Sequence, residues 1–157
     1  ARARKPGEAR GRASRSDGGA VKHLMLGFRG QLLTRSVSVT EDKNFFVEAT
    51  VLSSNMSAHP TGQLVCFFFP LRRDDAVSTH RVFTWLVAVC GVPRDDKERV
   101  DAVRENADRR LNAAVAEPFD NEFVGVPFRV SLSGKSIRNR IFHDYRFDAD
   151  VEVAVVP

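Results

Sequence analysis

The sequence is poor in the residues and motifs that build catalytic or metal sites. Its two cysteines, Cys66 and Cys90, lie inside apolar runs and not in a Cys-x-x-Cys pair, which predicts free buried thiols rather than a disulfide or a metal site. There is no Gly-rich phosphate loop, no GxSxG elbow and no HExxH motif. The histidines also lack the paired spacing of a zinc site; they are His23, His59, His80 and His143. We therefore expect a protein that is not an enzyme and holds no metal or cofactor.

Long apolar stretches are missing too. No run approaches the roughly 20 residues of a membrane helix, and the N-terminus lacks the apolar region of a secretory signal. These absences predict a soluble, cytoplasmic protein without a membrane partner. No small-molecule substrate is evident either.

The positive charge is concentrated at the N-terminus. The chain has 24 Lys or Arg against 20 Asp or Glu, and six of the basic and two of the acidic residues fall in residues 1–20. The remaining residues, 21–157, are therefore neutral overall. Residues 1–20 contain no large apolar side chain and cannot bury enough surface to offset their ordering entropy. We expect a disordered basic arm at 1–20, followed by one globular domain at 21–157.

The segment between Asn44 and Leu71 carries five phenylalanines and reads as two strands joined by a polar turn. In the first strand the uniformly apolar set predicts an inner face; it consists of Phe45, Val47, Ala49 and Val51. In the second strand the more evenly apolar set is Leu64, Cys66 and Phe68. The outer face is then predicted to hold Phe46, Phe67 and Phe69. Exposed aromatics indicate an interface, one form of which is a platform for unpaired bases; the alternative is that a helix or another subunit covers this face.

The other segments complete a recognisable order. Alternation predicts a first strand from Leu26 with a bulge near Gly30, and two closing strands at 123–133 and 140–150. Helical periodicity predicts one helix from Asp74 or Asp75 to Gly91, with Trp85 in the core, and a second at 95–117. Three strands, two helices and two strands form the order of the five-stranded Greek-key barrel called the OB-fold. This fold binds oligonucleotides or oligosaccharides on its strands 2 and 3.

A cationic region accompanies the last two strands. It is predicted to include a polar hairpin loop at 133–140. The alternative for this loop is that its basic tip is simply solvated, as such tips more often are. Cations neutralise phosphates while aromatic faces accept any base, so the combination suits single strands. The candidate phosphate-binding residues are Arg129, Lys135, Arg138, Arg140 and Arg146.

Several runs resemble phage-encoded single-stranded-DNA-binding proteins of the OB type. They are KNFFVEATVLSSN, TGQLV, VFTWLVAVCGV and GVPFRVSLSGKSIRNRIFHDYRF. The resemblance implies a sequence-tolerant binder of single-stranded DNA that acts in phage DNA replication or recombination, in the host cytoplasm. The expected partners are single-stranded DNA and other copies of the chain in a homo-oligomer. The alternative is a virion or assembly protein with a β-barrel core and an interacting basic arm.

Overall fold

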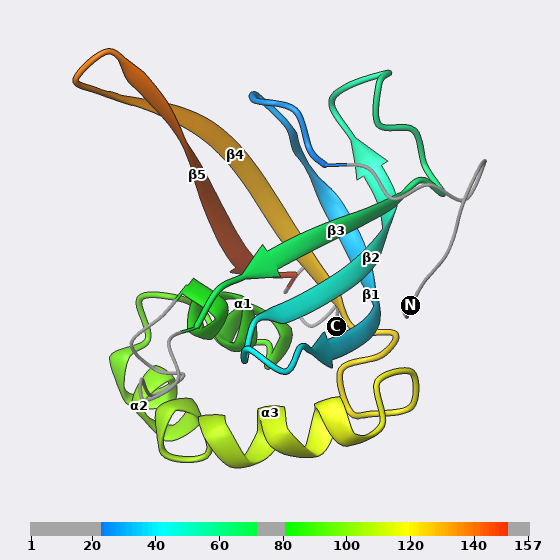
Figure 1. Cartoon of the computed structure of the whole chain (residues 1–157), viewed down its shortest axis with the longest axis vertical. Coiled ribbons are helices and arrows are strands. Elements are labelled where there is room, and N and C mark those ends of the chain that lie inside the picture. The colour runs from blue at the N-terminus through cyan, green and yellow to red at the C-terminus, as the bar shows by residue number, and fades with distance from the viewer. Residues whose placement is uncertain (1–22, 72–80, 151–157) are drawn as a thin grey trace, which may run out of the picture.

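The computed structural model describes residues 23–71 and 81–150. Five strands form one antiparallel sheet in the order β3-β2-β1-β4-β5, and three helices lie between β3 and β4 in the chain (Figure 1). The elements are β1 (Arg29–Val39), β2 (Phe45–Ser54), β3 (Leu64–Phe69), α1 (Arg81–Val89), α2 (Lys97–Glu105), α3 (Ala107–Ala116), β4 (Pro127–Ile137) and β5 (Arg140–Ala149). The predicted placing of helices between the third and fourth strands is confirmed. The predicted basic arm lies outside the described residues.

The sheet is not closed into a barrel, which corrects the expected closed form. Its two edges are β3 and β5, which are not hydrogen-bonded to each other. The inner faces of these edges nevertheless meet through side chains: the Phe67 ring of β3 lies 5.6 Å from Tyr145 and 5.3 Å from Phe147 of β5, centroid to centroid. Aromatic contacts of this kind contribute about 0.5–1.5 kcal/mol each beyond simple burial. The sheet is thus curled by ring packing, without a ladder between its edges.

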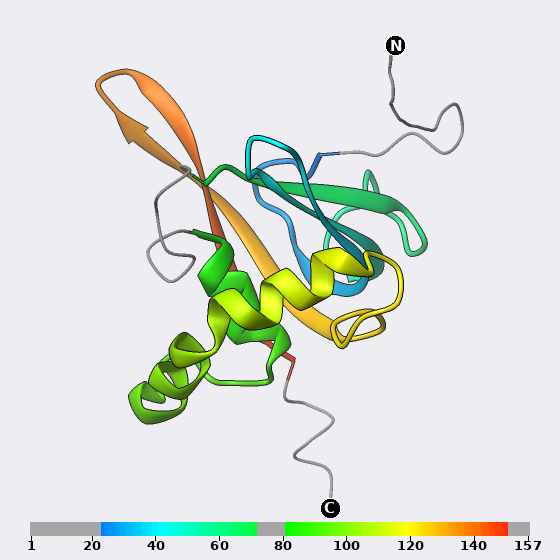
Figure 2. The ribbon, with the colours of Figure 1, turned by 60° about the horizontal axis from the view of Figure 1, so that its bottom comes forward.

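The core fills the inner side of this curled sheet. The predicted inner set of β2, from Phe45 to Val51, is fully buried, and so is Trp85 on α1, as predicted. The helices cover this side: α1 packs against β5 and β4, and α3 packs along β1 (Figure 2). In the part of the chain that the structure describes, no helix is long and apolar enough to cross a membrane.

The predicted faces of β3 are wrong. Phe67 and Phe69 are buried, with 3% and 2% of their surfaces exposed, whereas Phe68 is 48% exposed. The register explains this, because Phe67 lies opposite Val47 and Phe69 opposite Phe45, both in the core set of β2. The misleading residue is Gln63, which belongs to the preceding turn and not to the strand.

Two register shifts interrupt the pairing of β1 with β2. One lies between Gln31 and Leu32, close to the predicted bulge, and leaves Leu52 of β2 as the extra residue. The other lies between Thr34 and Ser36 and leaves Arg35 of β1 unpaired with β2. Such bulges bend a strand and increase its twist. They contribute to the curvature of the sheet.

The second predicted helix is two helices. α2 ends and α3 begins at Asn106, whose φ of −115° and ψ of 10° are not helical. The apolar stripe still continues across the break, because Val103, Ala107 and Leu111 are all buried. Periodicity therefore identified the buried face but not the interruption. The predicted start of the first helix, near Asp74, lies outside the described residues.

Gly30 is required by a close approach of the backbone. A Cβ at this position would lie 2.2 Å from the carbonyl oxygen of Ser53 and 2.7 Å from the Phe28 ring. We expect Gly30→Ala to lower the free energy of unfolding by roughly 3 kcal/mol, measured by urea denaturation. Gly134→Ala is the matched control, because its Cβ would meet only side-chain atoms of Ile141 and Leu26, the nearest at 3.2 Å. Equal losses in both variants would contradict this account.

Candidate functional site

An aromatic pair lies on the outer face of β2 and β3. Phe46 and Phe68 are directly opposite each other in the register, and their ring centroids are 4.9 Å apart at 55°. Phe46 is partly buried, as expected for the outer face, and Phe68 is half exposed. The sequence prediction therefore identified Phe46 correctly, but it named the core residues Phe67 and Phe69 in place of Phe68.

The second feature is the long β4–β5 hairpin, which projects from the body of the molecule (Figure 1). Its ladder continues to the pair Ile137 and Arg140, so the predicted loop at 133–140 is wrong. Only Arg138 and Asn139 form the turn, with φ of 52° and 66°. Two positive φ values in a two-residue connection are typical of a type I′ turn. The end of β4 could not be recognised from the sequence in this region, because neither face of the hairpin end is buried and the sequence there shows no apolar alternation.

One face of this hairpin combines an aromatic ring with cations. Phe142 is 47% exposed and lies directly opposite Lys135, while Arg140 lies two residues away on the same face. Arg138 occupies the tip. In the part of the chain that the structure describes, none of these three cations forms an ion pair. Sequence reasoning missed Phe142, although its place in an otherwise polar set (Asp144, Arg146, Asp148) marks it as an outer residue.

The other two predicted cations are held by carboxylates. Arg129 Nε lies 3.4 Å from Oδ1 of Asp150, whose other oxygen accepts a hydrogen bond from Gln31. Arg146 Nε lies 3.8 Å from Asp148, which also pairs with Arg94 at 2.5 Å. Their charges are therefore partly neutralised. Of the five predicted cations, three lie at the hairpin end and two, Arg129 and Arg146, are in ion pairs.

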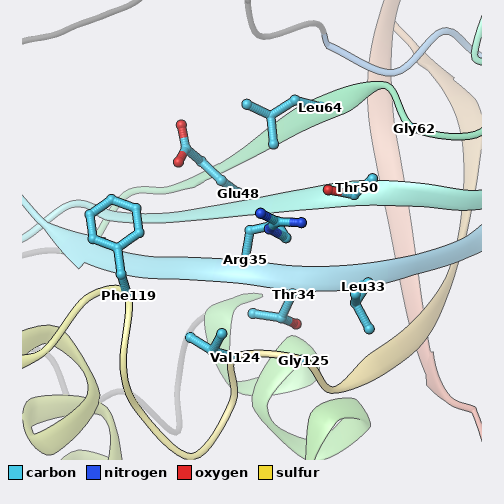
Figure 3. Close-up of a pocket in the computed structure, with 10 residues that line it drawn as sticks. All are labelled: Leu33, Thr34, Arg35, Glu48, Thr50, Gly62, Leu64, Phe119, Val124 and Gly125. Atoms are coloured by element: carbon cyan, nitrogen blue, oxygen red, sulfur yellow. The ribbon is translucent and has the colours of Figure 1, made fainter.

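A pocket of about 630 Å³ opens on the outer side of β1, β2 and β3 (Figure 3). Glu48 projects into this region from β2, and its Oε1 accepts a hydrogen bond of 3.0 Å from the Ser36 hydroxyl. The Phe119 ring, 73% exposed, forms a wall on the same side of the ribbons as Glu48 and Arg35 (Figure 3). The lining residues are Leu33, Thr34, Arg35, Glu48, Thr50, Gly62, Leu64, Phe119, Val124 and Gly125.

The loop that carries Phe119 is fixed to β1. The Gly125 N–H donates to the Thr34 carbonyl at 2.8 Å, and the Val37 N–H donates to the Pro118 carbonyl at 3.1 Å. The Asn121 amide adds three further bonds, to carbonyls of Ala114, Glu117 and Pro118. β4 pairs with β1 only as far as Leu33, so the loop takes over the rest of that edge. The wall of the pocket is thus preformed.

Cys66 lies opposite Glu48 in the register. Burial, assisted by the nearby Glu48 carboxylate, raises the pKa of the Cys66 thiol to about 12. The thiol is therefore neutral at physiological pH. Both cysteines are free, as predicted, but they are only partly buried.

His59 is buried for a structural reason. Its Nε2 accepts a hydrogen bond of 3.0 Å from the Met25 N–H, and its Nδ1 lies 2.5 Å from Gln63 Oε1. Because Nε2 is an acceptor here, Nδ1 is the donor to Gln63. The ring joins the β2–β3 connection to the segment before β1. Among the described residues, no group of three or more His, Cys, Asp or Glu side chains could hold a metal ion.

No protein-family model matches the sequence, and no curated protein matches it significantly. The resemblance to phage single-stranded-DNA-binding proteins therefore stays a prediction.

The corrected faces of β3 can be tested by stability. We expect Phe67→Ala to lower the free energy of unfolding by roughly 3–5 kcal/mol, as for a fully buried ring. Phe68→Ala removes a half-exposed ring and is expected to cost about 1 kcal/mol or less. Urea denaturation of both variants provides the measurement. A larger loss for Phe68→Ala than for Phe67→Ala would restore the faces predicted from the sequence.

Proposed function

We propose that this protein binds single-stranded DNA, with little dependence on sequence, along the outer face of an open OB-type sheet. The strand order β3-β2-β1-β4-β5 is that of a five-stranded OB barrel cut between β3 and β5, and the helices lie between strands 3 and 4. The binding surface of OB-folds runs over strands 2 and 3 and the loop between strands 4 and 5. Phe68 on β3 and Phe142 on the β4–β5 hairpin, both about half exposed, lie at those places.

The observation that carries the proposal is the composition of the hairpin face. Phe142 lies directly opposite Lys135 and two residues from Arg140, so one short surface offers a ring for a base and two cations for phosphates. Base stacking contributes about 1–3 kcal/mol per base and is tolerant of sequence, because every base has a π face. A solvated hairpin tip needs no half-exposed phenylalanine among its cations.

Phe46 and Phe68 provide a second stacking position on the same face of the sheet. A single strand that follows the face from the hairpin to this pair crosses the partly neutralised arginines Arg129 and Arg146. Duplex DNA keeps its bases stacked inside and cannot use either ring. The arrangement therefore favours unpaired strands.

The biological role that fits is the coating of single strands during phage DNA replication or recombination, as a homo-oligomer. The alternative, an assembly or virion protein, has one observation in its favour. On the opposite face of the hairpin, Ile141 is 65% exposed and lies close to the 40% exposed Leu26 beside Gly134. This apolar patch could pack against another copy.

Stacking by Phe142 gives a direct test. We expect Phe142→Ala to weaken binding of a fluorescein-labelled single strand by about 1–3 kcal/mol while leaving the melting temperature nearly unchanged. Ile141→Ala is the matched control, since Ile141 occupies the opposite face of the same strand. Fluorescence anisotropy measures both. If Ile141→Ala changes self-association and neither variant changes DNA binding, the assembly role replaces this proposal.

The hairpin cations are expected to set the salt dependence. Arg138→Gln should lower the slope of log affinity against log salt by roughly 0.7, the value for one phosphate contact on a single strand. Arg109→Gln removes the same charge from the surface of α3 and should leave the slope unchanged. Titrations at several salt concentrations decide the matter. A slope that is insensitive to Arg138 would place the phosphate path elsewhere.

A further inference from the structure

The pocket beside the aromatic pair contains the carboxylate of Glu48. A carboxylate is unexpected in the binding surface of a protein that binds polyanions. Phe46, Glu48 and Thr50 follow each other at two-residue spacing on the outer face of β2. A base stacked on Phe46 or Phe68 would therefore lie next to Glu48, which follows Phe46 along the outer face of β2. Negative charge at this place repels phosphates, so the carboxylate needs another explanation.

Glu48 is positioned as a hydrogen-bond acceptor. The Ser36 hydroxyl donates to its Oε1 and thereby fixes the carboxylate, while the second oxygen has no partner among the described residues. An ionised carboxylate can only accept hydrogen bonds. Cys66, directly opposite, keeps a neutral thiol and adds no competing charge. The group that fits Glu48 is an N–H donor on the ligand.

The rest of the pocket suits a flat ring. The exposed Phe119 ring forms one wall and Leu64 contributes apolar surface, while Arg35 and Thr50 lie on the same outer side (Figure 3). Arg35 can only donate hydrogen bonds and Thr50 can do either. Cytosine presents an amino group beside a ring nitrogen and a carbonyl oxygen. Thymine presents a carbonyl where cytosine has the amino group, and two acceptors would then face each other.

We propose that this pocket is a base-selective subsite that accepts a base with an exocyclic amino group, cytosine above all, through Glu48, and that it disfavours thymine. The inference rests on the proposed function and adds a preference to it: the stacking rings bind any base, while the pocket tests one base of the bound strand. Acidic side chains that accept from the cytosine amino group are an established mode of base reading.

The test compares fluorescein-labelled oligodeoxycytidine and oligothymidine of equal length in anisotropy titrations at one salt concentration. We expect the wild-type protein to bind the cytidine strand about tenfold more tightly, as for one well-placed base contact. Glu48→Gln supplies an amide that can donate to the thymine carbonyl, so the ratio of affinities should fall to within about twofold of one. Glu41→Gln is the matched control, because it removes the same charge from the exposed β1–β2 loop and should keep the preference.

A second variant distinguishes the contribution of the pocket wall to overall affinity from the contribution of Glu48 to base preference. Phe119→Ala removes a ring that is 73% exposed, so we expect the fold to remain intact. The variant should weaken binding of both strands by a similar factor, because stacking does not distinguish bases. Equal binding of the two strands by the wild type, or a preference that persists in Glu48→Gln, would overturn the subsite and leave the proposed function standing. Binding of neither strand would overturn both.

Discussion

The packing of Phe67 against rings from the far edge of the sheet is the interaction on which the other features depend. Phe67 touches Phe128 of β4 and both Tyr145 and Phe147 of β5, so one side chain joins strands that share no hydrogen bond. With Phe67 inside, alternation along β3 forces Phe68 outside, beside Phe46. The exposed pair is thus a consequence of how the core closes. Any change that turned β3 over would bury Phe68, place Phe67 and Phe69 on the outer face and remove both of them from the core.

The bulges connect this curvature to the pocket. At Arg35 the extra residue of β1 lets Ser36 remain opposite Glu48, and the Ser36 hydroxyl then fixes that carboxylate. Beyond Leu33 the edge of β1 is free of β4, and the Phe119 loop binds there through backbone hydrogen bonds. The pocket therefore exists because β1 changes partners in mid-strand. A flat, regular strand would have neither the free edge nor the projecting arginine.

The order of strands and helices along the chain, the core set of β2 and the burial of Trp85 could be predicted because they depend on local periodicity. The face of β3 could not be read in the same way, since three successive phenylalanines carry no alternation and the prediction then depended on Gln63. Register supplies the missing information: Val47 must face Phe67 once the two strands are joined by the observed turn. The pocket was beyond prediction for a different reason. Glu48 and Phe119 are 71 residues apart in the sequence and meet only through the loop after α3.

The charges on the outer face limit how the surface can bind a polyanion. Arg129, Arg146 and Arg94 already face Asp148 or Asp150, so a phosphate would have to compete with carboxylates for them. Among the described residues, no carboxylate pairs with the three cations at the hairpin end. Arg138, in the turn, adopts a left-handed conformation that costs about 1–2 kcal/mol for a residue with a side chain. In the proposed binding mode, stacking on the exposed rings contributes a share of the affinity that does not depend on these cations. Such a surface would remain bound to single strands at salt concentrations at which a protein that binds only through phosphate contacts dissociates.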